Sequence, residues 1–211
     1  MALSEERAFL LRYRPLSEER LWLELFGQSL GKIVAIGRKP SPPPYWTELS
    51  LTLTRRGGEL FTLRGWDEGE ATLLRGRRVI AAFYLNELLI YLLPREEPMP
   101  QLFETYRKTL SDLSGDLEAA LRRFELELLK AIGYDLPLQE EFQSELRYRY
   151  IPEGGFEPSP VGEVSGRTLK ALRERRLEGE EVRGEAKRLL RRVIAHHLGS
   201  RRLRSRELWR G

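Results

Sequence analysis

Hydrophobic and polar residues alternate along the first third of the chain, as they do in strands with one face in a core. The first predicted strand places Phe9, Leu11 and Tyr13 on one face and Leu10, Arg12 and Arg14 on the other. Five strands are predicted in all, over residues 8–16, 21–26, 32–37, 48–55 and 59–63. Turn-forming glycines and prolines separate them. Five short strands in this order are typical of a small Greek-key barrel of the OB type.

From residue 79 onward the hydrophobic residues recur at helical spacing. Residues 79–93 are hydrophobic nearly all round and stop at Pro94, which predicts a buried central helix. Later helices are predicted to begin at Pro100, after an Asp116 cap, after a Ser165 cap and at Glu180, with a terminal turn capped by Ser205. The last long helix is predicted to end at Gly199. A small hairpin is expected around Gly154-Gly155.

The predicted fold class is therefore α+β, with an N-terminal five-stranded OB-fold β-barrel followed by an α-helical domain. The predicted domains are a DNA-binding barrel over residues 1–78 and a helical domain over residues 79–211. The helical domain carries a small cysteine-free insert at about 138–163.

Charge is distributed unevenly along the chain. Residues 167–211 carry 15 lysines and arginines against 6 acidic residues, a balance of +9, whereas residues 79–166 carry 8 against 16, a balance of −8. From Lys187 to Trp209 no carboxylate interrupts the basic run until Glu207. Such asymmetry between segments is typical of contact with a polyanion such as nucleic acid.

Composition excludes several classes of protein. The chain has no cysteine, so disulfides, thiolate nucleophiles and cysteine-based zinc sites are absent. Residues 79–93 are shorter than the ~20 residues that cross a bilayer, and the first residues lack the hydrophobic stretch of a signal peptide. The sequence predicts a soluble cytoplasmic protein with no membrane contact.

No arrangement of residues typical of catalysis stands out. Glu125 and Glu127 lie two apart on a predicted helix and cannot converge on a metal, and Gly57-Gly58 is interpreted as a hairpin turn, not a phosphate-binding loop. The chain is predicted to be no enzyme, with no cofactor and no metal site. A magnesium-dependent nuclease is the third hypothesis, and it is discounted because the sequence offers no set of metal ligands.

Basic residues beside aromatic ones are the candidates for binding DNA, because lysine and arginine contact phosphates and aromatic rings stack on bases. In the barrel the predicted DNA-binding residues are Arg12, Arg14, Lys32, Arg38, Lys39 and Trp46. Toward the C-terminus they are Lys187, Arg191, Arg201, Arg202, Arg204 and Arg206. The alternative is that these charges keep the surface soluble and the aromatic rings close the core. His196 and His197 are interpreted as packing residues at a helix end.

Five segments occur in an order that resembles the RecO family of recombination mediators. They are GRKP, YLNELLIYLLPREEPMPQLFETY, LRRFELELLKAIGY, SGRTLKAL and AKRLLRRVIAHHLGSRRLRSREL. The resemblance implies an OB domain with a helical domain behind it, and a nucleoid-associated role in DNA repair. It further implies binding of single- and double-stranded DNA, annealing of complementary strands, and loading of RecA, usually with RecR, onto strands covered by the single-stranded-DNA-binding protein SSB.

The chain departs from this family at two places. Many members hold zinc with a cysteine cluster in the region that matches residues 138–155, which has no cysteine here. The loop after the third strand, residues 37–46, is shorter and less basic than usual in the family.

A partner site is also expected from the resemblance. The acidic tail of SSB ends in a hydrophobic side chain and a carboxylate, which would fit a hydrophobic slot with arginine at its rim. The residues predicted to form it are Tyr106, Lys108, Arg122, Arg123 and Phe124. The alternative is that Phe124 belongs to the core. A protein-interaction adaptor with incidental DNA binding is the second hypothesis for the whole chain.

Overall fold

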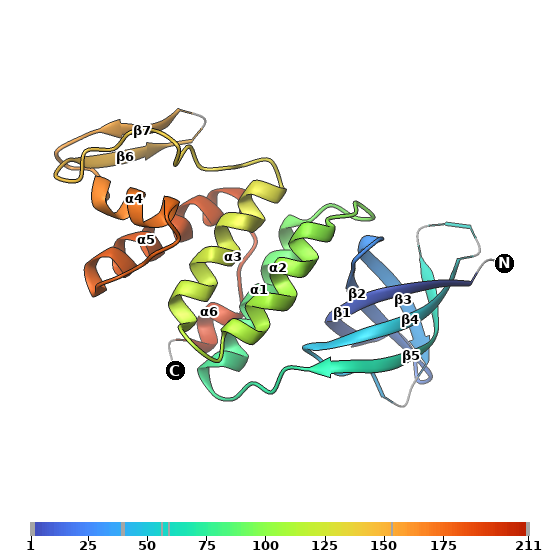
Figure 1. Ribbon diagram of the computed structural model, residues 1–211. Coiled ribbons are helices and arrows are strands. Elements are labelled where there is room, and N and C mark those ends of the chain that lie inside the picture. The colour runs from blue at the N-terminus through green and yellow to red at the C-terminus, as the bar shows by residue number, and fades with distance from the viewer. Residues whose placement is uncertain (1–2, 39–40, 56, 59, 153, 210–211) are drawn as a thin grey trace. The chain divides into compact units, whose positions relative to one another are not determined.

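A computed structural model describes residues 3–38, 41–55, 57–58, 60–152 and 154–209. The first five strands form a closed barrel in the order β1-β2-β3-β5-β4, with β3 and β5 parallel and the other pairs antiparallel (Figure 1). Their bounds are β1 Leu3–Pro15, β2 Arg20–Gly27, β3 Gly31–Arg38, β4 Thr47–Arg55 and β5 Phe61–Ala71. The predicted fold class is confirmed, with β1 and β5 longer than expected.

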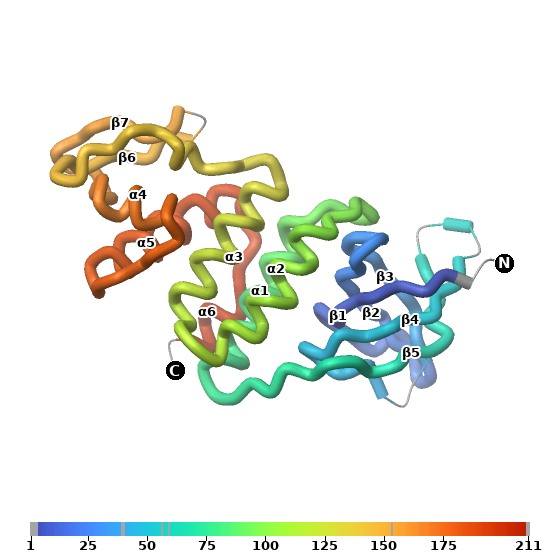
Figure 2. Tube along the Cα trace, in the orientation of Figure 1, coloured from blue at the N-terminus to red at the C-terminus, as the bar shows by residue number. Residues whose placement is uncertain are grey.

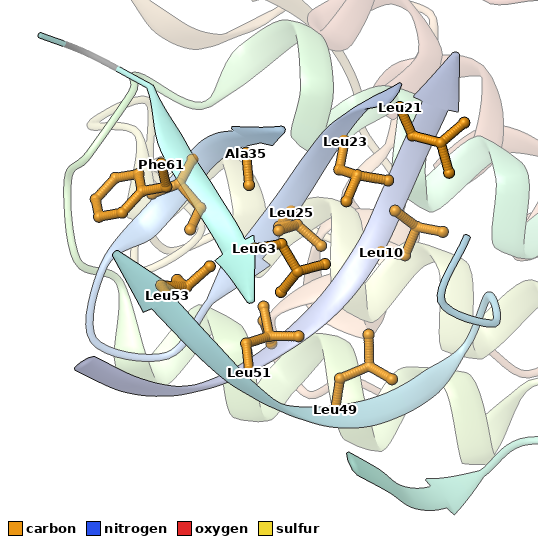
Figure 3. Close-up of a cluster of buried hydrophobic side chains, with 12 residues drawn as sticks. Leu10, Leu21, Leu23, Leu25, Ala35, Leu49, Leu51, Leu53, Phe61 and Leu63 are labelled. Carbon is orange, nitrogen blue, oxygen red and sulfur yellow. The ribbon is translucent and has the colours of Figure 1, made fainter. Parts of the chain in front are cut away.

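Hydrophobic side chains from every strand fill the barrel, most of them leucines, with Ile33 and Ala35 from β3 (Figure 3). The predicted alternation of β2 is confirmed, because Leu21, Leu23 and Leu25 are all buried in this core. Each such leucine contributes roughly 1.5–3 kcal/mol relative to an exposed one.

The predicted faces of β1 are wrong, because a register shift interrupts the pairing of β1 with β2 between Leu10 and Arg12. Leu10 pairs with Leu25 and lies in the barrel core, whereas Arg12 pairs with Glu24 on the outer face. The extra residue of a bulge reverses the alternation beyond it.

The chain divides into two compact units, and their limits differ from the strand-to-helix transition in the sequence. The first unit holds Met1–Ser114 and Leu203–Gly211, and the second holds Gly115–Arg202. The first therefore contains the barrel, α1 (Arg77–Leu92), α2 (Pro100–Asp112) and α6 (Ser205–Leu208). The predicted domain boundary after residue 78 stays a prediction.

Aromatic residues attach α2 to the outer face of the barrel. Phe9 and Phe26 each contact Phe103, at 5.3 and 5.7 Å between ring centroids. The buried hydroxyl of Tyr106 donates to Asn86 Oδ1 at 2.6 Å, and Asn86 Nδ2 donates to the Leu11 carbonyl at 2.9 Å. The one amide in the hydrophobic helix α1 thus joins α1, α2 and β1.

The second unit packs three helices with a small sheet in the order β7-β6-β8. Its elements are α3 (Leu117–Ala131), β6 (Arg147–Ile151), β7 (Gly155–Pro158), β8 (Val164–Ser165), α4 (Gly166–Arg173) and α5 (Glu180–Leu198). The predicted caps are confirmed, since Asp116 accepts from the Ala119 amide at 3.1 Å and Ser165 from the Thr168 amide at 3.2 Å. The hairpin at Gly154-Gly155 is confirmed as β6 and β7.

A buried carboxylate holds the second unit together. Glu185 on α5 accepts from the Ser165 amide at 2.8 Å and from the Ser165 and Thr168 hydroxyls at 2.7 Å each. Its other oxygen lies 2.9 Å from the guanidinium of Arg147. Burial acts to raise the pKa of Glu185, but these hydrogen bonds outweigh burial, and the pKa is lowered. The carboxylate links α5 to β6, β8 and the start of α4.

After α5 the chain returns to the first unit and lies against α1 (Figure 2). We call residues 203–209 the C-terminal clasp. The prediction that Ser205 caps a terminal helix is wrong, because Ser205 is the first residue of α6 and its hydroxyl donates to Glu87 at 2.5 Å. None of the helices in the described ranges has the length and hydrophobicity needed to cross a membrane.

Candidate nucleic-acid interface

Strands β1, β2 and β3 bring basic residues together on the outer face of the barrel. The pairing places Arg14 beside Trp22 and Trp22 beside Ile36, and it places Arg20 beside Arg38. Neighbouring strands lie ~4.8 Å apart, and residues two apart on one strand are ~6.6 Å apart. We call this set of side chains the basic barrel face. It consists of Arg12, Arg14, Arg20, Trp22, Ile36 and Arg38.

Three arginines of this face have their charge exposed to solvent. Arg14, Arg20 and Arg38 are exposed, and none forms an ion pair with a carboxylate in the part of the chain that the structure describes. The Arg14 guanidinium lies over the Trp22 ring, 4.8 Å from its centroid. Arg12 differs, because Glu24 lies 2.7 Å from its guanidinium. The exposed Glu18 and Glu19 follow in the β1–β2 turn and bound the face at one end.

Sequence analysis missed Arg20 as a member of this face. Arg20 is distant in sequence from Arg38, and only the antiparallel register of β2 and β3 makes them neighbours. The usable signal was that a basic and an aromatic residue alternate with buried leucines on β2.

Two of the predicted barrel residues have structural contacts. The Lys32 ammonium donates to the Ile90 carbonyl in the last turn of α1 at 2.6 Å, where a helix dipole favours positive charge. Trp46 packs edge-on against Phe83 of α1, with ring centroids 4.9 Å apart. These contacts favour packing over DNA binding for both residues. Lys39 lies outside the described residues.

Along α5 some cations, including the predicted DNA-binding residue Lys187, already have carboxylate partners. Lys187 lies 2.7 Å from Glu118, and Arg192 lies 2.6 Å from Glu163. Arg188 and Arg191 are exposed and form no ion pair with a described carboxylate.

The terminal arginines fall into two groups. Arg201, Arg202 and Arg204 are exposed, whereas Arg206 is half-buried with its guanidinium 5.9 Å from the centroid of the Tyr84 ring. Glu87 on α1 accepts from the amides of Arg204 and Ser205 at 2.9 and 3.0 Å. The backbone of the clasp is thus anchored to Glu87, and the Arg206 side chain of the clasp lies over the Tyr84 ring of α1.

The predicted partner residues lie in different environments. Tyr106 belongs to the first unit and Phe124 to the second, and both rings are fully buried. Burial raises the pKa of Tyr106 well above its usual range. Arg122 is buried with its guanidinium 2.7 Å from Glu125. The two rings belong to cores, so the structure does not support a surface slot formed by them. Among the predicted partner residues, Lys108 is exposed and Arg123 is partly buried.

Metal ligands and a surface hollow are the remaining candidate sites in the described ranges. No group of three or more His, Cys, Asp or Glu side chains in these ranges is arranged to hold a metal ion. The second unit contains an open hollow of ≈ 340 Å³, whose charged lining mixes both signs. Its charged residues are Arg167, Lys170, Arg176, Glu174 and Glu178.

Comparison with known proteins identifies close relatives along nearly the whole chain. The family described as "Recombination protein O C terminal" matches residues 74–207. DNA repair protein RecO of Methylococcus capsulatus is 43% identical over 225 residues, which cover 97% of this chain and 92% of the relative. DNA repair protein RecO of Halorhodospira halophila is 40% identical over 222 residues, with coverage of 96% and 95%. The protein of the same name from Coxiella burnetii is 36% identical over 222 residues, with 96% of each chain covered.

Proposed function

Because this chain belongs to the RecO family and so has a role in DNA repair and recombination, we propose that it is a non-enzymatic mediator that binds DNA strands and anneals them. It binds both single- and double-stranded DNA. It also helps to load RecA onto single strands covered by SSB, and its partners are SSB and RecR.

The basic barrel face is the observation that carries this proposal. Three exposed arginines surround one tryptophan on the β2–β3 side of an OB barrel, the face with which such barrels bind oligonucleotides. In the proposed complex Arg14, Arg20 and Arg38 contact phosphates, and Trp22 with its overlying guanidinium presents a flat surface to a base.

Annealing requires that two strands be held at once. One barrel face holds one strand, and the exposed cations of α5 and of the segment after it supply contacts for the second. Neutralising phosphates on both strands lowers their mutual repulsion, and holding them together replaces diffusional encounter. The acceleration therefore needs no bond to be made or broken by the protein.

Contact with SSB is proposed to use surface cations. Its acidic tail needs positive charge, which each unit offers separately, at Lys108 in the first unit and at Arg123 in the second. An adaptor that holds protein partners and binds DNA only incidentally is the second candidate. It is favoured by the ion pairs of Lys187 and Arg192, which occupy cations that DNA would otherwise contact.

Annealing of complementary labelled oligonucleotides, with and without bound SSB, tests the proposal. The protein is expected to speed annealing of bare and SSB-covered strands and to bind single strands less tightly as salt rises. Each phosphate contact adds about 0.7 to the steepness of log affinity against log salt. Annealing at the rate of free strands, with affinity indifferent to salt, would favour the adaptor.

A further inference from the structure

An aromatic pair lies at the surface of the second unit, where α3 and α5 both end. The rings of Tyr134 and His197 stack with centroids 3.9 Å apart and planes inclined by 29°. His196 meets His197 edge-on at 5.3 Å. We call Tyr134, His196 and His197 the aromatic platform.

The backbone beside the platform is fixed by a hydrogen bond, and two of its three rings are exposed to solvent. The Tyr134 amide donates to the Leu129 carbonyl at 2.8 Å, which fixes the chain just beyond α3. Yet Tyr134 is 53% exposed, and His196 is exposed as well. Burial, together with the nearby His196, lowers the pKa of His197, which favours the neutral form of this ring. More than half of Tyr134 is therefore available to a ligand.

Basic residues follow or precede the platform residues closely in the chain. Lys130 is exposed in the last turn of α3, and Arg201 and Arg202 are exposed just after α5. The Arg201 amide donates to the Leu198 carbonyl at 3.2 Å, so a turn keeps the two arginines near the helix end. Even a fully extended chain would place Arg201 no more than about 14 Å from His197. Asp135 is an exposed carboxylate beside Tyr134.

We propose that the aromatic platform stacks an unpaired base of single-stranded DNA while Arg201 and Arg202 contact the adjacent phosphates. A flat aromatic surface next to cations is the arrangement with which proteins bind single strands without reading their sequence. The platform then belongs to the surface that holds the second strand. This inference rests on the proposed function, because it gives the proposed second DNA surface a base-binding element.

Substitution of Tyr134 in the full chain tests the platform, with two kinds of oligonucleotide as probes. One is a single strand with ordinary bases, and the other is an abasic strand of the same length and charge. Stacking on one aromatic side chain contributes ~1–3 kcal/mol per base, or about fivefold or more in affinity. Tyr134→Leu is expected to weaken binding of the base-bearing strand by that factor, with an unchanged salt slope, and to leave the abasic strand unaffected.

Two further variants serve as controls for folding. Tyr134→Phe keeps the ring and is expected to bind as the parent does. Tyr134→Trp enlarges the ring and is expected to bind at least as tightly, and the indole fluorescence that it adds to that of the parent's four tryptophans should be quenched by the base-bearing strand and not by the abasic one. These two variants keep the test valid even if Tyr134→Leu proves unstable.

The outcomes separate this inference from the proposed function. Equal weakening of both strands by Tyr134→Leu, or no weakening of either, with the parent still binding in a salt-dependent way, would overturn the platform alone. A parent protein that binds neither strand in a salt-dependent way would overturn the proposed function and the platform with it.

Discussion

The basic barrel face and the basic α5 region use their cations in different ways. On the barrel face Arg14, Arg20 and Arg38 are exposed and form no ion pair with a described carboxylate. Around α5, Lys187 and Arg192 pair with Glu118 and Glu163 on other elements of the second unit. The C-terminal segment has the larger balance of charge in the sequence, +9 for residues 167–211.

This difference shows that net charge in a segment overstates what is available to a ligand. A cation that already has a carboxylate partner must break that pair before it contacts a phosphate, and its removal mainly affects the protein's own structure. Substitutions on the barrel face should therefore change DNA affinity with little effect on stability. Substitutions of the paired cations in the second unit should lower stability and leave DNA affinity nearly unchanged.

The largest effect is expected from the buried carboxylate of the second unit. Glu185→Gln removes a charge that accepts hydrogen bonds from two hydroxyls and an amide and pairs with Arg147. Arg147 is partly exposed, but the carboxylate is buried, and weakening the hydrogen bonds to a buried charge costs about 3 kcal/mol. Urea unfolding should show the loss, whereas the exposed control Glu178→Gln should unfold like the parent.

The same residue predicts a pH dependence. The pKa of Glu185 is lower in the folded chain than its ordinary value, so its stabilisation is fully present above the unfolded pKa of ~4.3. The stabilisation is lost as pH falls below that value through the folded pKa. Between about pH 5 and about pH 3, the range in which carboxyl groups titrate, the parent should therefore lose more stability than Glu185→Gln. Equal losses would show that Glu185 does not control this unit.

The second effect concerns the barrel face itself. Replacing Arg14, Arg20 and Arg38 with Ala should flatten the salt slope for single strands by about 2, because each phosphate contact contributes ~0.7. If the parent and the variant bind equally at about 1 M salt, this difference in slope makes the variant's affinity near 0.1 M up to about 100-fold lower. The midpoint of thermal unfolding should hardly change, because exposed charges contribute little to stability.

The matched control replaces three exposed arginines outside this face, namely Arg75, Arg77 and Arg149. It makes the same change in net charge. If the control flattens the slope as much as the barrel variant does, binding depends on overall charge and the face has no special role.

Prediction from sequence succeeded where the determinant is local and failed where it is not. The period of two in β2 and the caps at Asp116 and Ser165 depend on neighbouring residues, and each was predicted correctly. The bulge after Leu10 reverses one face of β1 and leaves no local mark in the sequence.

The candidate site illustrates the same limit. Whether Lys32 reaches DNA or the end of a helix depends on where α1 ends in space, which is set by packing over 58 positions of separation. Arg20 joined the site only through strand register. The aromatic platform joins residues 134 and 197, whose proximity follows from the packing of α3 on α5.

A third and smaller effect is expected at the C-terminal clasp. Glu87 accepts from two amides and the Ser205 hydroxyl, so Glu87→Gln removes charge-assisted hydrogen bonds worth about 1–2 kcal/mol. The clasp should open more often, and limited proteolysis should cut faster beyond residue 199. Glu104→Gln, which alters a surface ion pair with Arg107, is the control expected to leave the cleavage rate unchanged. Equal cleavage of all three proteins would mean that Glu87 does not hold the clasp.

The smallest effect is the most direct test of the comparison, because it sets paired against unpaired cations on one helix. Lys187→Ala with Arg192→Ala removes two cations that have carboxylate partners, and Arg188→Ala with Arg191→Ala removes two exposed ones that pair with no described carboxylate. Both double variants lose the same charge from α5.

If ion pairing withholds a cation from DNA, the paired double variant should keep the parent's salt slope and lose at most about 1 kcal/mol of stability per pair. The unpaired double variant should keep its stability and flatten the slope by up to about 1.4, because each phosphate contact contributes ~0.7. Equal flattening by the two variants would mean that the Glu118 and Glu163 pairs open when DNA binds, and that the whole basic face of α5 is available to the second strand.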